Sequence, residues 1–215
     1  MKSSRISLSL LVALLVAPAM LVAQELKPIE LPKPQMSGGK PLMEALKARH
    51  TSREFKPDPL PAPVLSNLLW AAFGVNRPES GKRTAPSAMN WQGIDIYVFL
   101  ADGVYVYDAK ANRLNPVLAG DFRASTGTQD FVKDAPLNLA YISDFAKTRN
   151  ASPEDRDLYT AVDAGLIVQN VYLFCASEGL ATVVRGSVDR AALAKVLKLR
   201  PDQRIIVAQT VGYPK

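Results

Sequence analysis

The residues best suited to chemistry in this 215-residue chain lie in one short stretch, Arg49-His50-Thr51-Ser52-Arg53-Glu54-Phe55. It contains the only histidine of the chain, two arginines and two neighbouring hydroxyl groups. Guanidinium groups, hydroxyls and free backbone amides in a short turn are donors that bind a phosphate monoester. A charged stretch of this length is more often a solvated loop, so the rest of the chain must decide between the two interpretations.

The other reactive side chains exclude several classes of site. Cys175 is the only cysteine, so the chain forms no intramolecular disulfide. One cysteine and one histidine cannot assemble a usual zinc or iron–sulfur site. Cys175 lies in an apolar helical pattern, which favours a core residue over a nucleophile. The chain also has no glycine-rich dinucleotide or P-loop fingerprint.

The charge balance favours a small anion over a polyanion. The net charge is +6, and it becomes 24 − 20 = +4 without Lys2 and Arg5. There is no run of lysine and arginine such as a duplex-binding protein shows, so we expect no nucleic-acid partner.

The N-terminus has the layout of a secretory signal. Lys2 and Arg5 precede an apolar stretch from Ile6 to Val16, and Pro18 and small residues follow it. We therefore predict a signal peptide over residues 1–23, a periplasmic or secreted protein, and no stable membrane insertion after cleavage. An uncleaved anchor is the alternative, because residues 6–23 are nearly long enough to span a bilayer.

The remaining chain is predicted to form a linker and one domain. Residues 24–40 are rich in proline and glycine, which is typical of a linker or of an arm that lies across another surface. The predicted elements of the domain over residues 41–215 are helices over 41–48 and 61–73, a β-hairpin over 94–107 with its turn at Asp102-Gly103, a helix near 121–132, a strand over 137–143, a helix over 153–178, a strand over 180–184, a helix over 190–198 and a strand over 204–212. Helices and strands mix without a regular βαβ alternation, which predicts an α+β layered fold.

Three motifs in this order resemble the nitroreductase superfamily of FMN-dependent oxidoreductases. Residues 49–55 match its opening Arg-Arg/His-Ser-x-Arg/Lys-x-Phe element, and residues 86–92, Pro-Ser-Ala-Met-Asn-Trp-Gln, match Pro-Ser-x-x-Asn-x-Gln. The third motif is a long helix that leads into Gly-Leu-Ala-Thr at 179–182, with Gly-Tyr-Pro at 212–214. Thr84 to Ala88, followed by Ile-Tyr-Val at 96–98, is most similar to the SagB-type, thiazoline-oxidase-like branch.

The resemblance, which covers about residues 41–214, implies a nitroreductase-like fold with a central mixed or antiparallel sheet flanked by helices. It also implies a homodimer with FMN bound between subunits and the long helix at the interface. Arg49 and Arg53 would bind the FMN phosphate, and His50 and Thr51 would complete the cradle. Lys215 could replace a basic residue that many relatives place beyond Gly-Tyr-Pro.

The resemblance also implies a ring end of the site. Ser87 and Asn90 would contact the isoalloxazine from one loop. Val184, Arg185 and Gly186 would pass along the ring, where the family uses backbone N–H groups near the reactive flavin nitrogen. The chain departs from the family at Gly93 and Ile94, which stand where a proline and a tryptophan are common.

The implied function is an FMN-dependent oxidoreductase that passes hydride or electrons to a small electron-poor acceptor such as a nitroaromatic or a quinone. NAD(P)H is a candidate electron donor. No catalytic side chain is assigned, because the flavin carries the chemistry. Two alternatives stay open: a SagB-like flavin dehydrogenase of a heterocycle or peptide, and an exported flavin-binding protein without turnover.

Overall fold

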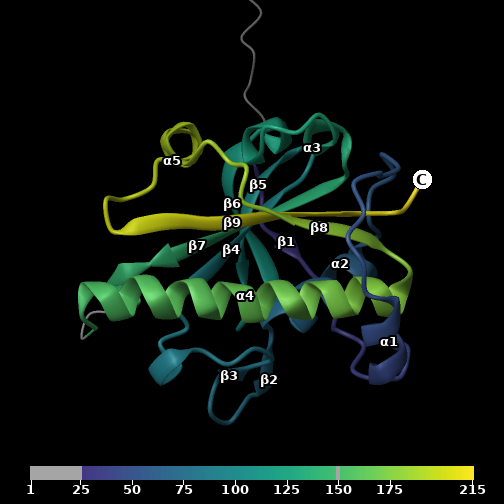
Figure 1. Ribbon diagram of the computed structural model, residues 1–215, viewed down its shortest axis with the longest axis horizontal. Coiled ribbons are helices and arrows are strands. Elements are labelled where there is room, and N and C mark those ends of the chain that lie inside the picture. The colour runs from purple at the N-terminus through teal and green to yellow at the C-terminus, as the bar shows by residue number, and fades with distance from the viewer. Residues whose placement is uncertain (1–25, 149–150) are drawn as a thin grey trace, which may run out of the picture.

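A seven-stranded antiparallel sheet forms the centre of the computed structural model, which describes residues 26–148 and 151–215 (Figure 1). The predicted signal peptide over residues 1–23 lies outside the described residues. The strands, in spatial order, are β1 (Ile29–Glu30), β6 (Arg113–Ala119), β5 (Gly103–Asp108), β4 (Ile94–Phe99), β7 (Leu137–Asp144), β9 (Gln203–Gly212) and β8 (Ala181–Arg185). All neighbouring strands in this sheet run antiparallel, and β8 is its last strand.

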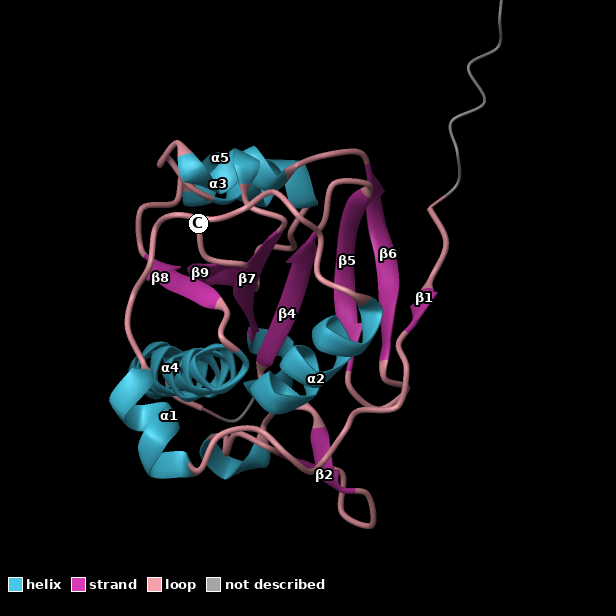
Figure 2. Cartoon of the chain, turned by 90° about the vertical axis from the view of Figure 1, so that its right-hand side faces the viewer, coloured by secondary structure: helices cyan, strands magenta, loops and turns pink. Residues whose placement is uncertain are grey.

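Helices cover both faces of the sheet, as the predicted α+β fold requires (Figure 2). One face carries α1 (Leu42–Ala48), α2 (Ala62–Phe73) and α4 (Pro153–Glu178), and the other carries the 3₁₀ segment η2 (Arg123–Thr126), α3 (Phe131–Asp134) and α5 (Arg190–Leu197). Side chains of β4 alternate between the two cores: Ile96 and Val98 pack under α2 and α4, whereas Tyr97 and Phe99 pack under α5. The sheet is therefore buried on both faces.

The long helix α4 begins and ends as the sequence predicts. Ser152 caps it by accepting a hydrogen bond from the Asp155 N–H at 3.1 Å, and Pro153 occupies the first turn. Gly179 ends it with a left-handed φ of 71°. By length and composition alone α4 could also cross a membrane, and 44% of its apolar window is buried in the fold.

Two predictions are wrong, namely the helix near residues 121–132 and the position of the β-hairpin turn. No helix spans residues 121–132; η2 and α3 are two short helical segments, separated by an extended Gly127, and β6 precedes them. Pro116 within β6 hides the strand pattern, since proline cannot donate to a ladder. The β4–β5 hairpin exists, but the Leu100 N–H bonds to the Gly103 oxygen, so its turn is centred one residue earlier than predicted.

The Pro-rich arm lies on its own domain. β1 pairs with β6, the Gln35 N–H donates to Asn67 Oδ1 at 2.8 Å, and the Lys40 N–H donates to Ser177 Oγ at 2.8 Å. Gly39, at φ +77°, allows this approach, because a Cβ there would overlap the Ser177 hydroxyl. The arm therefore spans from the edge of the sheet to the C-terminal end of α4.

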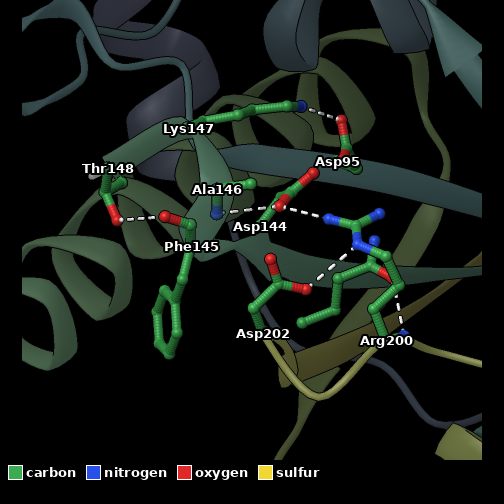
Figure 3. A network of polar contacts seen from close by, with 9 residues as sticks. Asp95, Asp144, Phe145, Ala146, Lys147, Thr148, Arg200 and Asp202 are labelled. Carbon is green, nitrogen blue, oxygen red and sulfur yellow. Dashed lines mark hydrogen bonds and ion pairs between the residues drawn. The ribbon is translucent and has the colours of Figure 1, made fainter.

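A polar network closes the end of the sheet where β7 finishes and β9 begins (Figure 3). Asp144 accepts from Arg200 Nη2 at 2.6 Å and from the Ala146 N–H at 3.1 Å, while Arg200 Nε reaches Asp202 at 3.0 Å. Half of the Arg200 side chain is exposed, so solvent screens these pairs and they add little to the stability of the fold. The network lies at the opposite end of the sheet from residues 49–55.

Candidate functional site

Residues 49–55 leave α1 as extended backbone along the outer edge of β8. The Ser52 N–H donates to the Thr182 oxygen at 3.0 Å. Phe55 then bridges to Pro214 in an antiparallel pairing, and the Lys56 N–H donates to the Tyr213 oxygen at 2.8 Å. The first and third predicted motifs therefore meet at one edge of the sheet, as their roles in a common site require.

Tyr172 of α4 ties this segment to β8. Its hydroxyl accepts from the Val184 N–H at 3.0 Å and lies 3.0 Å from Thr51 Oγ1. The Arg49 guanidinium lies over the same ring, 5.3 Å from its centroid. Sequence reasoning missed Tyr172 as a site residue, because it appeared only as one of the apolar and small residues of a core helix.

The charged groups of this segment are available to an anion. Arg53 and His50 are exposed and Arg49 is half-buried, and neither arginine forms an ion pair within residues 26–148 and 151–215. His50 Nδ1 lies 2.8 Å from the Ala48 oxygen, which can only accept, so this geometry assigns the ring hydrogen to Nδ1. We define Arg49, His50, Thr51 and Arg53 as the cationic segment.

The outer edge of β8 presents backbone amides beside the cationic segment. In an antiparallel ladder, alternate residues direct both backbone groups away from the partner strand. Thr182 and Val184 do so here, because they bond to Ser52 and Tyr172 instead of β9. Gly186 is the next residue in this alternation; it is exposed, and a Cβ there would meet nothing within 4 Å.

The predicted ring contacts come from a strained loop. Three non-glycine residues in it have positive φ: Met89 at 49°, Asn90 at 55° and Gln92 at 49°. Such conformations cost free energy and persist only where surrounding contacts enforce them. Ser87 Oγ accepts from the Gln92 N–H at 3.0 Å, and Asn90 Oδ1 accepts from Gln92 Nε2 at 3.2 Å. The Ser87 hydroxyl hydrogen and the Asn90 amide hydrogens therefore remain available to a ligand.

A buried carboxylate of α4 holds this loop. Both Asp163 oxygens accept from the Ala88 N–H, at 3.1 and 3.3 Å, and the residue is only 3% exposed. Burial raises the pKa of Asp163, and the hydrogen bond from Ala88 opposes that shift. One local signal could have identified Asp163, because it is an acid on the otherwise apolar face of a core helix.

Arg83 clamps the far side of the same loop. Its Nε donates to Gln92 Oε1 at 2.8 Å, its Nη1 donates to the Phe73 oxygen at 3.0 Å, and the guanidinium lies 4.7 Å from the Phe73 ring centroid. Arg83 belongs to β3 (Lys82–Arg83), which forms a small hairpin with β2 (Val75–Arg77) in a segment for which no helix or strand was predicted. The hairpin thus fixes the loop from outside the main sheet.

The cationic segment and the loop lie at two positions along α4. Their anchors, Tyr172 and Asp163, are nine residues apart in the helix, which is about 13 Å along its axis. Lys215 is exposed and lies beside Glu54 by the register of the Phe55–Pro214 bridge. It lines a separate cavity of about 720 Å³ together with Phe55 and Leu60.

This arrangement agrees with the comparisons with known proteins. The model of the nitroreductase family matches residues 46–213. The chain belongs to the nitroreductase family. Each predicted site residue except Lys215 lies within the matched range.

Individual nitroreductase relatives support the same assignment. A crystal structure of a candidate nitroreductase from Ralstonia eutropha JMP134 is 43% identical, with a TM-score of 0.85, over 90% of this chain and 92% of that one. A candidate nitroreductase from Methanocaldococcus jannaschii is 30% identical over 74% of this chain and 85% of its own length. The NADPH:FMN oxidoreductase of Vibrio harveyi shares the fold, with a TM-score of 0.61 at 22% identity, over 81% of this chain and 69% of that one.

Proposed function

We propose that this nitroreductase-family oxidoreductase binds FMN along the β8 edge and passes hydride or electrons through it to a small electron-poor acceptor. The observation that carries the proposal is the cationic segment, whose two arginines lack carboxylate partners within the described residues and whose neighbour Ser52 bonds to the outer edge of β8. A phosphate is the anion that such a set of donors fits.

The phosphate end would be held by charge and by hydroxyl donors. Arg49 and Arg53 would supply guanidinium forks and Thr51 would supply a hydroxyl. His50 would reach the phosphate through Nε2, which donates only when both ring nitrogens carry a hydrogen. Lys215 is assigned the smallest role, because it lies beside Glu54 and is exposed. Charge-assisted hydrogen bonds are about twice as strong as neutral ones, so this end would supply most of the affinity.

The ring end would be held by neutral donors. The Ser87 hydroxyl and the Asn90 amide have hydrogens to donate, and the Gly186 N–H is the outward-facing backbone donor at the end of β8. When bound, the flavin supplies the hydride chemistry itself. The protein would bind and orient it, which agrees with the absence of an assigned catalytic side chain.

A second copy of the chain would complete the site. The helix face expected at a dimer interface is partly used inside the chain, because Ala164 and Val168 are buried in its own core. A different face of α4 is exposed and apolar, with Leu158 at 59%, Val162 at 48% and Leu166 at 39%, each four residues from the next. We propose that this face packs against its counterpart in a homodimer, with the flavin between subunits.

The acceptor and the donor follow from the same proposal. A nitroaromatic or a quinone accepts electrons from reduced flavin, and NAD(P)H is the proposed donor, as the name of the Vibrio harveyi enzyme suggests. The N-terminal signal layout supports a periplasmic or secreted protein, which would load FMN after export. The SagB-like motif at Thr84 to Ala88 favours one second candidate, a flavin-dependent dehydrogenase of a heterocycle or peptide.

Absorption spectroscopy of the purified chain from residue 24 tests the proposal. We expect a flavin spectrum that is bleached anaerobically by NADPH or dithionite and restored by a quinone. A colourless protein that also fails to bind added FMN contradicts the proposal. Size-exclusion chromatography with light scattering tests the dimer, because Val162→Glu should give a folded monomer with weaker FMN retention. Val106→Glu is the comparison variant; it places a charge against the core beneath α5 and should unfold the chain.

A further inference from the structure

Arg185 is a buried cation without an anionic partner. It is 3% exposed, and no carboxylate within residues 26–148 and 151–215 forms an ion pair with it. All its contacts are neutral: Nε donates to Thr210 Oγ1 at 3.0 Å, Nη1 to the Thr126 oxygen at 2.6 Å, and Nη2 to Asn138 Oδ1 at 3.0 Å and Thr126 Oγ1 at 3.3 Å. The guanidinium is thus hydrogen-bonded on all three nitrogens but not neutralised.

The fold makes room for this group. Thr126 comes from η2, Asn138 from β7 and Thr210 from β9, so three elements supply the acceptors. A Cβ at Gly127 would overlap Arg185 Nη1, so the close passage of this extended backbone requires glycine. Burial lowers the pKa of Arg185 to about 10, which leaves it charged at neutral pH.

A buried charge of this kind is expensive unless something offsets it. Neutral hydrogen bonds recover only part of the solvation that an ion loses on leaving water. A purely structural tie between η2 and the sheet needs no net charge, since a neutral glutamine could still donate to two of these acceptors. The charge therefore points to an electrostatic role.

The position of Arg185 identifies what its charge acts on. It lies on β8 between Val184, whose N–H is held by Tyr172, and Gly186, the exposed residue at the end of the open edge. We propose, on the basis of the FMN site above, that Arg185 acts through space to favour the reduced, anionic flavin and so sets its reduction potential. We assign its side chain a positioning role for charge, because the guanidinium is buried and bonds only to protein groups within the described residues.

The direction in which Arg185 shifts the reduction potential of FMN follows from the electron count. Hydride transfer from NAD(P)H breaks the C–H bond of the reduced nicotinamide and delivers two electrons and one proton to FMN. The nicotinamide is oxidised, and the flavin gains one negative charge. A fixed positive charge in a medium of low dielectric constant stabilises that added charge, and therefore raises the reduction potential.

Two variants remove the net charge in different ways. Arg185→Gln deletes the guanidinium, whereas Asn138→Asp keeps it and places a carboxylate 3.0 Å from its Nη2. Arg185→Lys retains the charge with fewer hydrogen bonds. Asn76→Asp, at an exposed position, makes the same charge change as Asn138→Asp far from the network.

The measurement is the midpoint potential of bound FMN, taken by anaerobic titration against reference dyes at constant pH. We expect Arg185→Gln and Asn138→Asp each to weaken the preference for reduced over oxidised FMN at least tenfold, which is 29.6 mV for a two-electron couple. Arg185→Lys and Asn76→Asp should leave the potential near that of the wild type. Circular dichroism identifies any variant that does not fold. If Arg185→Gln does not fold, the midpoint potential of Asn138→Asp tests the proposal.

The outcomes separate this inference from the proposed function. If FMN stays bound and the potential is unchanged while thermal stability falls, Arg185 is only a structural tie and the inference is wrong. In that case the FMN proposal stands. A wild-type protein that binds no FMN overturns both.

Discussion

Two positions along α4, Tyr172 and Asp163, anchor the two ends of the candidate site in different ways. At the Tyr172 end, the cationic segment is extended backbone that bonds to β8, and Phe55 and Lys56 pair with the residues after β9. At the Asp163 end, the loop has three positive-φ residues and depends on side-chain hydrogen bonds. The first end is an extension of the sheet, and the second is a strained loop attached to a helix.

This difference indicates that the cationic segment contributes to affinity alone, whereas the Asp163 contact contributes to both stability and binding. Backbone pairing along the sheet fixes the spacing of Arg49 and Arg53 regardless of their side chains, so charge can be placed there without strain. The loop directs Ser87 and Asn90 only while Asp163 holds it. Changes at the cationic segment should therefore remove affinity and leave the fold intact, whereas changes at Asp163 should affect stability and binding together.

The largest effect should come from Arg49→Ala with Arg53→Ala. Hydrogen bonds to charged groups contribute about 1.5–3 kcal/mol each, so losing two should weaken FMN binding about 10²–10⁴-fold. The melting temperature of the apoprotein should change little, because neither side chain forms an ion pair within the described residues. Equilibrium dialysis against FMN and differential scanning calorimetry measure the two quantities.

The matched control for this pair removes two exposed lysines elsewhere, Lys33→Ala with Lys110→Ala. It changes the net charge equally and should leave FMN binding nearly unchanged. Equal losses of affinity in both double variants would mean that overall charge, and not the cationic segment, attracts the ligand.

A change at Asp163 should have an intermediate effect on both binding and stability. Asp163→Leu leaves the Ala88 N–H without its partner, which costs about 1–3 kcal/mol of unfolding free energy. FMN binding should weaken about tenfold, because the strained loop is no longer held. Urea unfolding and FMN titration measure the two effects. Unchanged protection of the loop amides from hydrogen exchange in the apoprotein would contradict this role.

The pH dependence gives a second test of Asp163. Burial raises its pKa in the folded state above the value in the unfolded chain, so the folded protein holds this proton more tightly. Its contribution to stability is therefore largest below the unfolded pKa, about 3.9, and declines as pH rises through the folded pKa. Asp163→Asn should abolish this decline while keeping an oxygen for Ala88. If the unfolding free energy of the wild type and of Asp163→Asn falls equally with rising pH, another titrating group causes the fall.

The smallest effect should come from Tyr172→Phe. The hydroxyl joins Thr51 to the Val184 N–H, and its loss should cost about 1 kcal/mol, or about fivefold in FMN affinity. Tyr159→Phe, on an exposed turn of the same helix, is the control and should change neither quantity. A loss as large as that of the arginine pair would place the main anchor of the phosphate end on Tyr172.

The sequence predicted the cationic segment because its residues are consecutive. Arg49 to Phe55 can be recognised without knowing the fold, and the α4 boundaries follow from Ser152, Pro153 and Gly179. Alternation in β4 likewise predicts a strand of a β-hairpin. Each of these signals is local, so short-range physical rules suffice to read it.

The supporting residues could not be predicted in the same way. Asp163 and Tyr172 gain their roles from Ala88, 75 residues away, and Thr51, 121 residues away. The helix expected near residues 121–132 failed for a similar reason, because Gly127 there accommodates the Arg185 guanidinium from β8. Long-range contacts decide these positions, and one sequence does not display them.

The most direct test of the central claim compares FMN with riboflavin, which lacks the phosphate. Isothermal titration of both ligands into the wild type and the Arg49→Ala, Arg53→Ala variant forms a cycle that isolates the phosphate contact. We predict that the wild type prefers FMN about 10²-fold or more, and that the variant binds both ligands with nearly equal weak affinity. A wild type that binds the two equally, or a variant that keeps the full preference for FMN, would contradict the assignment of the cationic segment to the phosphate.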